Sequence, residues 1–165
     1  MADSGNNYVR DNNFTKVLRS LATDCSQFKT EACKEVFEWW QSYQPDMPQK
    51  NQFDILDHIE KAPNIFLIAV LGNGQFRYCL HGEEVVRLVG KSQAGTLFSV
   101  DNADNDLSRF ARFLEELCSK KSAMHSYGTL DAHGKSYLNF ESLDFPLVDE
   151  QGVITHTVGL ITLVD

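Results

Sequence analysis

Histidine is the side chain best suited to acid–base chemistry near neutral pH, and this chain has five of them. No two are spaced four residues apart, and the sequence lacks the His-Glu-x-x-His pattern that presents two imidazoles to zinc from one helix. His58 and His133 are predicted to be exposed. His81 and His125 lie at the ends of predicted strands and can approach a cavity, but the sequence marks no carboxylate that would orient either ring as a base. We therefore expect no enzyme activity and no catalytic residue.

The cysteines and one acidic loop are the remaining candidates for redox or metal chemistry. No Cys-x-x-Cys spacing occurs, and the apolar surroundings favour buried, reduced thiols at Cys25, Cys33, Cys79 and Cys118. Residues 101–106 are rich in aspartate and asparagine. An EF-hand loop that begins at Asn102 would have Leu107 in place of the turn glycine and Phe113 in place of the bidentate glutamate. We expect no metal.

Polar side chains on predicted strands are the candidates for holding a small molecule. An apolar pocket orients its ligand with a few such groups. Tyr137 and Asn139 share a parity with Glu141 on one strand, and Tyr127 lies on the strand before it. The parity that faces a cavity stays open, because bulges shift the alternation. The predicted ligand-binding residues are Tyr78, His81, Tyr127, Tyr137 and Asn139.

Composition limits the class of protein. The 165 residues make one domain. Fifteen Lys and Arg against 23 Asp and Glu give a formal charge of −8, which repels phosphate backbones and anionic lipid. The longest apolar run, residues 65–71, is too short to span a bilayer, and residues 1–13 lack the blocks of a signal peptide. We expect a cytoplasmic protein that binds neither nucleic acid nor membrane.

Two amphipathic helices are predicted before the first strand. A capping box of Asp24 and Gln27 precedes a long stripe over residues 28–43. A shorter stripe with the spacing i, i+3, i+4, i+7 consists of Phe14, Val17, Leu18 and Leu21. Residues 1–44 are thus predicted to be a flexible tail with N-terminal helices, which form a dimerising or capping segment ahead of a domain over residues 45–165.

Strand patterns dominate the remaining chain. An apolar run at 64–71, the turn Gly72-Asn73-Gly74 and alternation over 75–81 predict a β-hairpin. Helices are predicted at 82–89 and over residues 107–121, and strands at 124–131, 135–147 and 153–164. The order predicts an α+β fold, with an antiparallel sheet that has helices on one face and a second face for the N-terminal helices.

Several segments resemble PAS sensor domains. The run Phe76-Arg77-Tyr78-Cys79-Leu80-His81-Gly82-Glu83-Glu84, followed by Val89-Gly90-Lys91, is similar to their strand-into-helix segment. The helix with Phe37-Glu38-Trp39-Trp40 and the later Phe145-Pro146-Leu147 narrow the resemblance to a bacterial family of short PAS proteins, over residues 36–164. The resemblance implies a five-stranded sheet in the order 2-1-5-4-3, with a cavity between the sheet and the crossover helices. It also implies a non-enzymatic sensory or regulatory module that binds a small ligand, a histidine kinase or another signalling protein.

The resemblance also bears on cofactors. Flavin-binding photoactive members carry Asn-Cys-Arg in the crossover, where this chain reads Gly90-Lys91-Ser92-Gln93-Ala94-Gly95. Haem-binding members use a histidine of the long crossover helix, and residues 107–121 contain none. Flavin and haem are therefore predicted to be unlikely cofactors, and an unidentified small ligand stays open.

The same patterns suggest two alternative functions and one oligomeric state. The first rival is a small cone-type α+β enzyme with a His–carboxylate pair in its pocket, and the second is a pure protein-interaction scaffold with a filled core. Because the longer helix is expected to cover the second face of the sheet, the shorter stripe of Phe14, Val17, Leu18 and Leu21 has little surface left to cover within one chain. We therefore expect a homodimer. Its predicted interface residues are Phe14, Val17, Leu18, Leu21 and Trp39.

Overall fold

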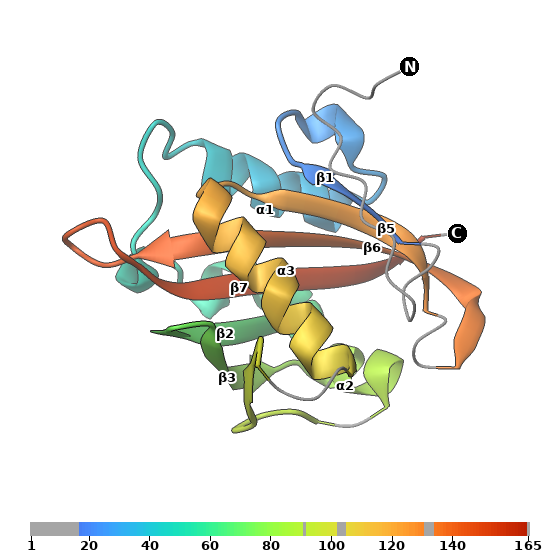
Figure 1. The fold of residues 1–165 in the computed structure, drawn as a ribbon. Helices are drawn as coiled ribbons and strands as arrows, with labels where there is room; N and C mark the ends of the chain where they lie inside the picture. Colours follow the sequence, from blue (N-terminus) through green and yellow to red (C-terminus); the bar gives the residue numbers. More distant parts are fainter. Residues whose placement is uncertain (1–16, 91, 102–104, 131–133, 165) are drawn as a thin grey trace, which may run out of the picture.

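The computed structural model describes residues 17–90, 92–101, 105–130 and 134–164, with only the backbone for 135–137. Within these ranges one antiparallel sheet has seven strands in the order β1-β5-β6-β7-β2-β3-β4 (Figure 1). The strands are β1 (Leu18–Leu21), β2 (Ile65–Gly72), β3 (Gln75–His81), β4 (Leu97–Ser99), β5 (Met124–Leu130), β6 (Lys135–Val148) and β7 (Ile154–Val164). Without the edge strands β1 and β4, the order is β3-β2-β7-β6-β5. This is the predicted order 2-1-5-4-3, and the fold has the PAS-like arrangement, with two strands more than expected.

The N-terminal strand β1 replaces the first predicted helix, so that prediction is wrong. β1 pairs with β5, from Leu18 opposite Tyr127 to Leu21 opposite Met124. Val17 is 1% exposed and Leu21 is half-buried, whereas Leu18 between them is exposed. A helix this short is marginal in water, while the free edge of β5 offers a row of backbone hydrogen-bond partners. The alternation of a strand therefore overrides the helical spacing.

The predicted capping box is present but serves a shorter element. Asp24 and Gln27 cap a single 3-10 turn (Cys25–Gln27), after which the chain becomes extended. The helix α1 (Glu31–Gln41) begins only after Thr30, whose side chain accepts a hydrogen bond from the backbone of the first turn. The two caps thus divide the predicted long helix into a turn and a helix.

Two apolar cores lie on the two faces of the sheet. The helix α3 (Asp106–Lys120) crosses one face, and α1 lies against the other (Figure 1). The short helix α2 (Glu83–Val89) belongs to the first face, and 3-10 segments at Lys50–Gln52 and Ile55–Asn64 connect α1 to β2. Trp40 Nε1 donates a hydrogen bond of 3.1 Å to the carbonyl oxygen of Pro146, which ties α1 to β6. Successive side chains of β5 and β6 therefore enter two different surroundings.

No helix in the described ranges combines the length and the apolar character that a membrane span needs. The longest, α3, is an amphipathic helix whose N-terminus is capped by Asn105, with a reciprocal bond to Ser108. Leu114 and Leu117 are fully buried on the side that faces the sheet, as the apolar spacing of this helix predicts.

Candidate functional site

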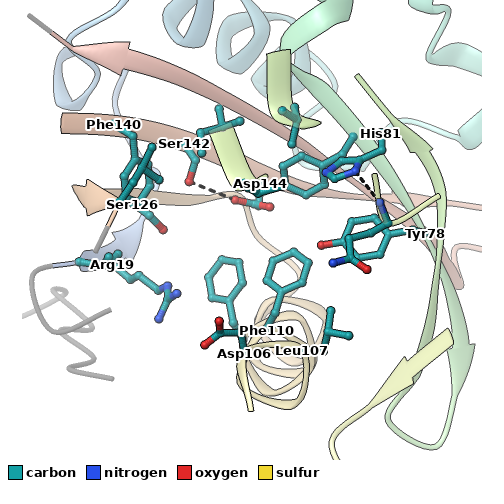
Figure 2. A pocket seen from close by; sticks show the side chains of 18 of the residues that line it. Arg19, Tyr78, His81, Asp106, Leu107, Phe110, Ser126, Phe140, Ser142 and Asp144 are labelled. Carbon is teal, nitrogen blue, oxygen red and sulfur yellow. Dashed lines mark hydrogen bonds between the residues drawn. The ribbon is translucent and has the colours of Figure 1, made fainter. Parts of the chain in front are cut away.

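A cavity of about 370 Å³ lies between the sheet and α3 (Figure 2). Its floor is formed by residues of β2, β3, β5, β6 and β7, and its other walls come from α2, α3 and the N-terminal strand β1. This is the place where the PAS resemblance predicts a cavity. The described part of the chain holds no group of three or more histidine, cysteine, aspartate or glutamate side chains that could bind a metal ion.

Aromatic rings form much of the wall. The ring of Phe110 on α3 lies 6.0 Å from that of Phe66 and 6.1 Å from that of Tyr78, centroid to centroid. Phe113 and Phe140 line the same space. Flat rings that approach a cavity from several sides favour a planar guest, because they offer faces and edges for stacking.

The floor has room for the Phe66 ring because residue 159 is a glycine. Phe66 on β2 lies opposite Gly159 on β7. A Cβ atom at position 159 would lie 1.9 Å from Cζ of Phe66, well inside van der Waals contact. Any side chain at this position would displace the ring, so Gly159 helps to set the shape of the cavity.

Asp144 is the polar group that distinguishes this cavity from a packing void. It projects from β6 into the cavity and is 2% exposed (Figure 2). One carboxylate oxygen, Oδ1, accepts a long hydrogen bond of 3.5 Å from Ser142 Oγ, and Oδ2 has no hydrogen-bond partner among the described residues. Burial raises the pKa of Asp144 to about 7, while the charge of Arg19 and the bond from Ser142 act in the opposite direction. Buried carboxyl groups without partners are costly and concentrate at functional sites.

Tyr78 and His81 form the opposite side of the cavity, with ring centroids 5.2 Å apart. Burial, and next the charge of Asp144, raise the pKa of the Tyr78 phenol, which therefore stays protonated. The backbone N–H of Gln93 donates a hydrogen bond of 2.9 Å to Nδ1 of His81. Burial lowers the pKa of His81, so its ring is neutral at pH 7, and its proton must lie on Nε2.

The strand β1 closes the cavity at one side. Val17 and Arg19, two residues apart, both line it, as strand alternation requires. Cζ of Arg19 lies 4.7 Å from the centroid of the Phe113 ring on α3, a distance typical of a cation–π contact. Arg19 thus connects the N-terminal edge of the sheet to the helix that covers it.

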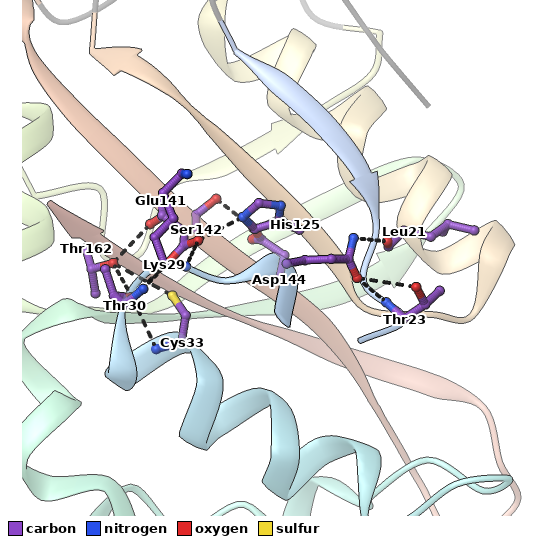
Figure 3. Close-up of polar contacts among 11 residues, drawn as sticks. Leu21, Thr23, Lys29, Thr30, Cys33, His125, Glu141, Ser142, Asp144 and Thr162 are labelled. Atoms are coloured by element: carbon purple, nitrogen blue, oxygen red, sulfur yellow. Dashed lines mark hydrogen bonds and ion pairs between the residues drawn. The ribbon is translucent and has the colours of Figure 1, made fainter. Parts of the chain in front are cut away.

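A buried His–carboxylate pair exists, but it lies on the other face of the sheet. His125 Nε2 is 2.9 Å from Glu141 Oε1 (Figure 3). The backbone N–H of Lys29 donates to Oε1 at 2.7 Å, and Thr30 donates to Oε2 twice, from its N–H at 2.9 Å and its Oγ1 at 2.8 Å. Glu141 therefore holds the start of α1 onto β6.

The bonds to Glu141 define its charge. Burial alone raises the pKa of Glu141, but the bonds from His125, Lys29 and Thr30 outweigh burial and bring the pKa down to about 2. Neither His125 nor Glu141 lines the cavity. A general base must reach its substrate, so this pair serves structure and does not support the rival of a cone-type enzyme.

The structure divides the predicted ligand-binding residues between the two faces. Tyr78 and His81 line the cavity. Tyr127 and Asn139 are exposed and share the parity of His125 and Glu141, so they do not line it. The side chain of Tyr137 lies outside the described residues. In both β5 and β6 the parity that faces the cavity is the one that the sequence reasoning did not choose.

Of the predicted interface residues, Val17 and Leu21 pack in the core beneath α3, Leu18 is exposed, and Phe14 lies outside the described residues. Trp39 is half-buried, and its ring meets those of Tyr43, Phe53, His58 and Phe145 at centroid distances of 5.2 to 6.0 Å. The surplus apolar helix on which the predicted homodimer rested is therefore absent from the described residues, and the dimer stays a prediction.

Two further expectations change. His58, predicted to be exposed, is buried and stacks on Phe53 at 5.3 Å, because the 3-10 segment Ile55–Asn64 brings its ring to 5.5 Å from that of Trp39. Cys79, predicted to be buried, is exposed on β3, since the neighbouring Tyr78 takes the inward position. Burial raises the pKa of Cys118 to about 11, which fits the inert thiol that we predict there.

The main cavity residues that the sequence reasoning missed are Arg19, Ser126, Ser142 and Asp144. The last two alternate with Phe140 along β6, as residues of one strand face do. An aspartate inside an otherwise apolar stretch of strand was the available signal, because such a residue is buried only at a cost. Arg19 had no such signal, since its segment resembled a helix.

No protein-family model matches the sequence, and no curated protein is significantly similar to it. Among solved structures, the dark state of the Aureochrome1 light-oxygen-voltage (LOV) domain is similar at 13% identity with a TM-score of 0.47, covering 68% of this chain and 84% of that one. A LOV domain studied with a flavin analogue has 9% identity and a TM-score of 0.46, covering 68% and 86%. The photoreceptor Vivid has 10% identity and a TM-score of 0.41, covering 72% and 99%. At such identities the similarity concerns the arrangement of the chain.

These similarities correct the prediction about flavin. Flavin was predicted to be unlikely because the crossover lacks Asn-Cys-Arg, but a structure of similar arrangement is a LOV domain studied with a flavin analogue. The prediction is therefore wrong as an exclusion. A missing crossover cysteine bears on photochemistry and does not by itself exclude flavin binding.

Proposed function

We propose that this protein is a non-enzymatic sensory module that binds a small organic molecule in the cavity between the sheet and α3. The observation that carries the proposal is an aromatic cavity of about 370 Å³ with the buried Asp144 aimed into it. Largely apolar pockets with few polar groups are typical ligand sites. A pure interaction scaffold would have a filled core at this place, so the cavity favours the sensor.

The signal is proposed to leave through β1. Arg19 of this strand and Val17 just before it belong to the cavity wall, while the backbone of β1 pairs, among the described strands, with β5 alone. A ligand that changes the contacts of Arg19 alters how firmly β1 is held, provided that it binds the two states with different affinity. The partner that reads this change, a histidine kinase or another signalling protein, is part of the same proposal.

The binding site is tested with N-phenyl-1-naphthylamine, a neutral probe whose fluorescence rises in apolar surroundings. We expect one probe per chain. Ser126→Phe places a ring in the cavity from the buried small residue on β5 and should abolish binding. Ser119→Phe, at an exposed position of α3, is the matched control and should bind as the parent does.

The outcomes distinguish binding of the probe in the cavity from binding elsewhere on the protein surface. Loss of binding in the Ser126 variant, with the control unchanged and both proteins folded by circular dichroism, supports the proposal. A parent protein that takes up no probe, or equal binding by both variants, would refute it.

A further inference from the structure

The carboxylate of Asp144 specifies what a ligand must offer. Its Oδ2 atom is buried, faces the cavity and has no partner among the described residues, and its Oδ1 atom has only the 3.5 Å contact with Ser142. A carboxylate oxygen accepts hydrogen bonds, and an accepted bond strengthens when the surroundings exclude water. The missing partner is therefore an N–H or O–H group brought by the ligand.

The charged groups and aromatic rings near Asp144 restrict the class of ligand further. Asp106, the other acidic residue of the described wall, is paired with Arg109 at 2.8 Å. An anionic ligand would be repelled by the buried carboxylate of Asp144, whereas a neutral or cationic donor would not be. The rings of Phe66, Tyr78 and Phe110 surround the space next to the carboxylate. A flat molecule fits between them.

We propose that the ligand is a planar heteroaromatic compound that donates an N–H hydrogen bond to Oδ2 of Asp144, as an aminoheterocycle or a cyclic amide does. The inference rests on the proposed function, because it names the class of molecule that the cavity takes. In this proposal Asp144 selects the ligand, and the rings of Phe66, Tyr78 and Phe110 stack against the heterocycle and orient it.

Two probes of nearly equal shape test the inference. In 2-aminoquinoline an amino group stands where 2-methylquinoline has a methyl group, so only the first donates a hydrogen bond. Isothermal titration with the full chain at about pH 8 gives both dissociation constants. We expect 2-aminoquinoline to bind about tenfold tighter or more, as a hydrogen bond to a charged group provides.

Variants show whether Asp144 causes the preference. Asp144→Leu keeps the branching at Cγ without an acceptor and should bind the two probes within about twofold of each other. Asp57→Leu makes the same change at an exposed aspartate outside the cavity wall and should keep the preference. If the leucine variant does not fold, Asp144→Asn serves in its place, and the loss of charge should reduce the preference severalfold.

The outcomes distinguish this inference from the proposed function. If neither probe binds the parent protein, the proposed function fails and the inference fails with it. If both probes bind with equal affinity, or the preference survives in the Asp144 variants, the cavity binds ligands but Asp144 does not select them. Preference in the parent and in the Asp57 variant, with its loss in the Asp144 variants, supports the inference.

Discussion

Replacing Asp144 by asparagine should change how stability depends on pH. Burial raises the pKa of Asp144 in the folded protein from the ordinary 3.8 to about 7. Below pH ~4 the group is protonated in both states. Between pH ~4 and ~7 the unfolded chain loses this proton and the folded chain keeps it, so the free energy of unfolding falls as pH rises. Three pH units at ~1.36 kcal/mol each give at most about 4 kcal/mol, which is a ceiling because the folded protein relaxes around the charge.

Urea unfolding at several pH values between about 4 and 8 measures this effect. The asparagine variant should match the parent near pH 4 and exceed it by up to about 4 kcal/mol near pH 8. Leu114→Ala, which removes no ionisable group, is the control and should lower stability by a similar amount at every pH. A difference between the asparagine variant and the parent that stays constant over the range would refute the reasoning.

Three further predictions follow from the packing. Val17→Asp should lower the free energy of unfolding by more than ~3 kcal/mol, because it buries an unpaired charge, while Leu18→Asp should change it by no more than ~1 kcal/mol. Equal losses of stability for the two variants in chemical denaturation would contradict the strand and favour the predicted helix. Leu114→Ala should cost ~2–5 kcal/mol, as truncation of a fully buried leucine does, and an unchanged denaturation midpoint would show that this face of α3 is not packed. Gly159→Ala should push the Phe66 ring into the cavity and weaken N-phenyl-1-naphthylamine about tenfold, ~1.4 kcal/mol, and an unchanged affinity in fluorescence titration would contradict the assigned shape.

Local patterns were sufficient where local and tertiary preferences agree. The hairpin of β2 and β3 follows from Gly72-Asn73-Gly74, in which all three residues have positive φ angles, and from the alternation on either side. The capping box of Asp24 and Gln27 forms as the spacing indicates. The order of the five central strands followed from the PAS resemblance and from the sequence of elements. For the hairpin and the capping box the signal lies within a few residues.

Patterns failed where the partner is distant in sequence. Residues 17–21 fit one face of a helix, but β5, more than a hundred residues later, offers them an open strand edge. Tyr127 and Asn139 have the residue types of a binding site, yet they lie on the face away from the cavity because the register of β5 and β6 points Ser126, Ser142 and Asp144 inward. Strand alternation fixes which residues share a face, and it does not say which face is covered by α3.

The sequence alone determined the class of fold, the central strands and the acidic charge, since periodicity, turn residues and composition act over short range or over the whole chain. The tertiary structure decided what these elements enclose. It paired His125 with Glu141 beneath α1 and away from the cavity, and it placed Asp144 under α3 with one oxygen that has no hydrogen-bond partner in the part of the chain that the structure describes. Both carboxylates belong to β6 and are three residues apart, with pKa values of about 2 and about 7. The difference arises because hydrogen-bond donors from distant segments reach one face of the strand, and an aromatic cavity forms on the other.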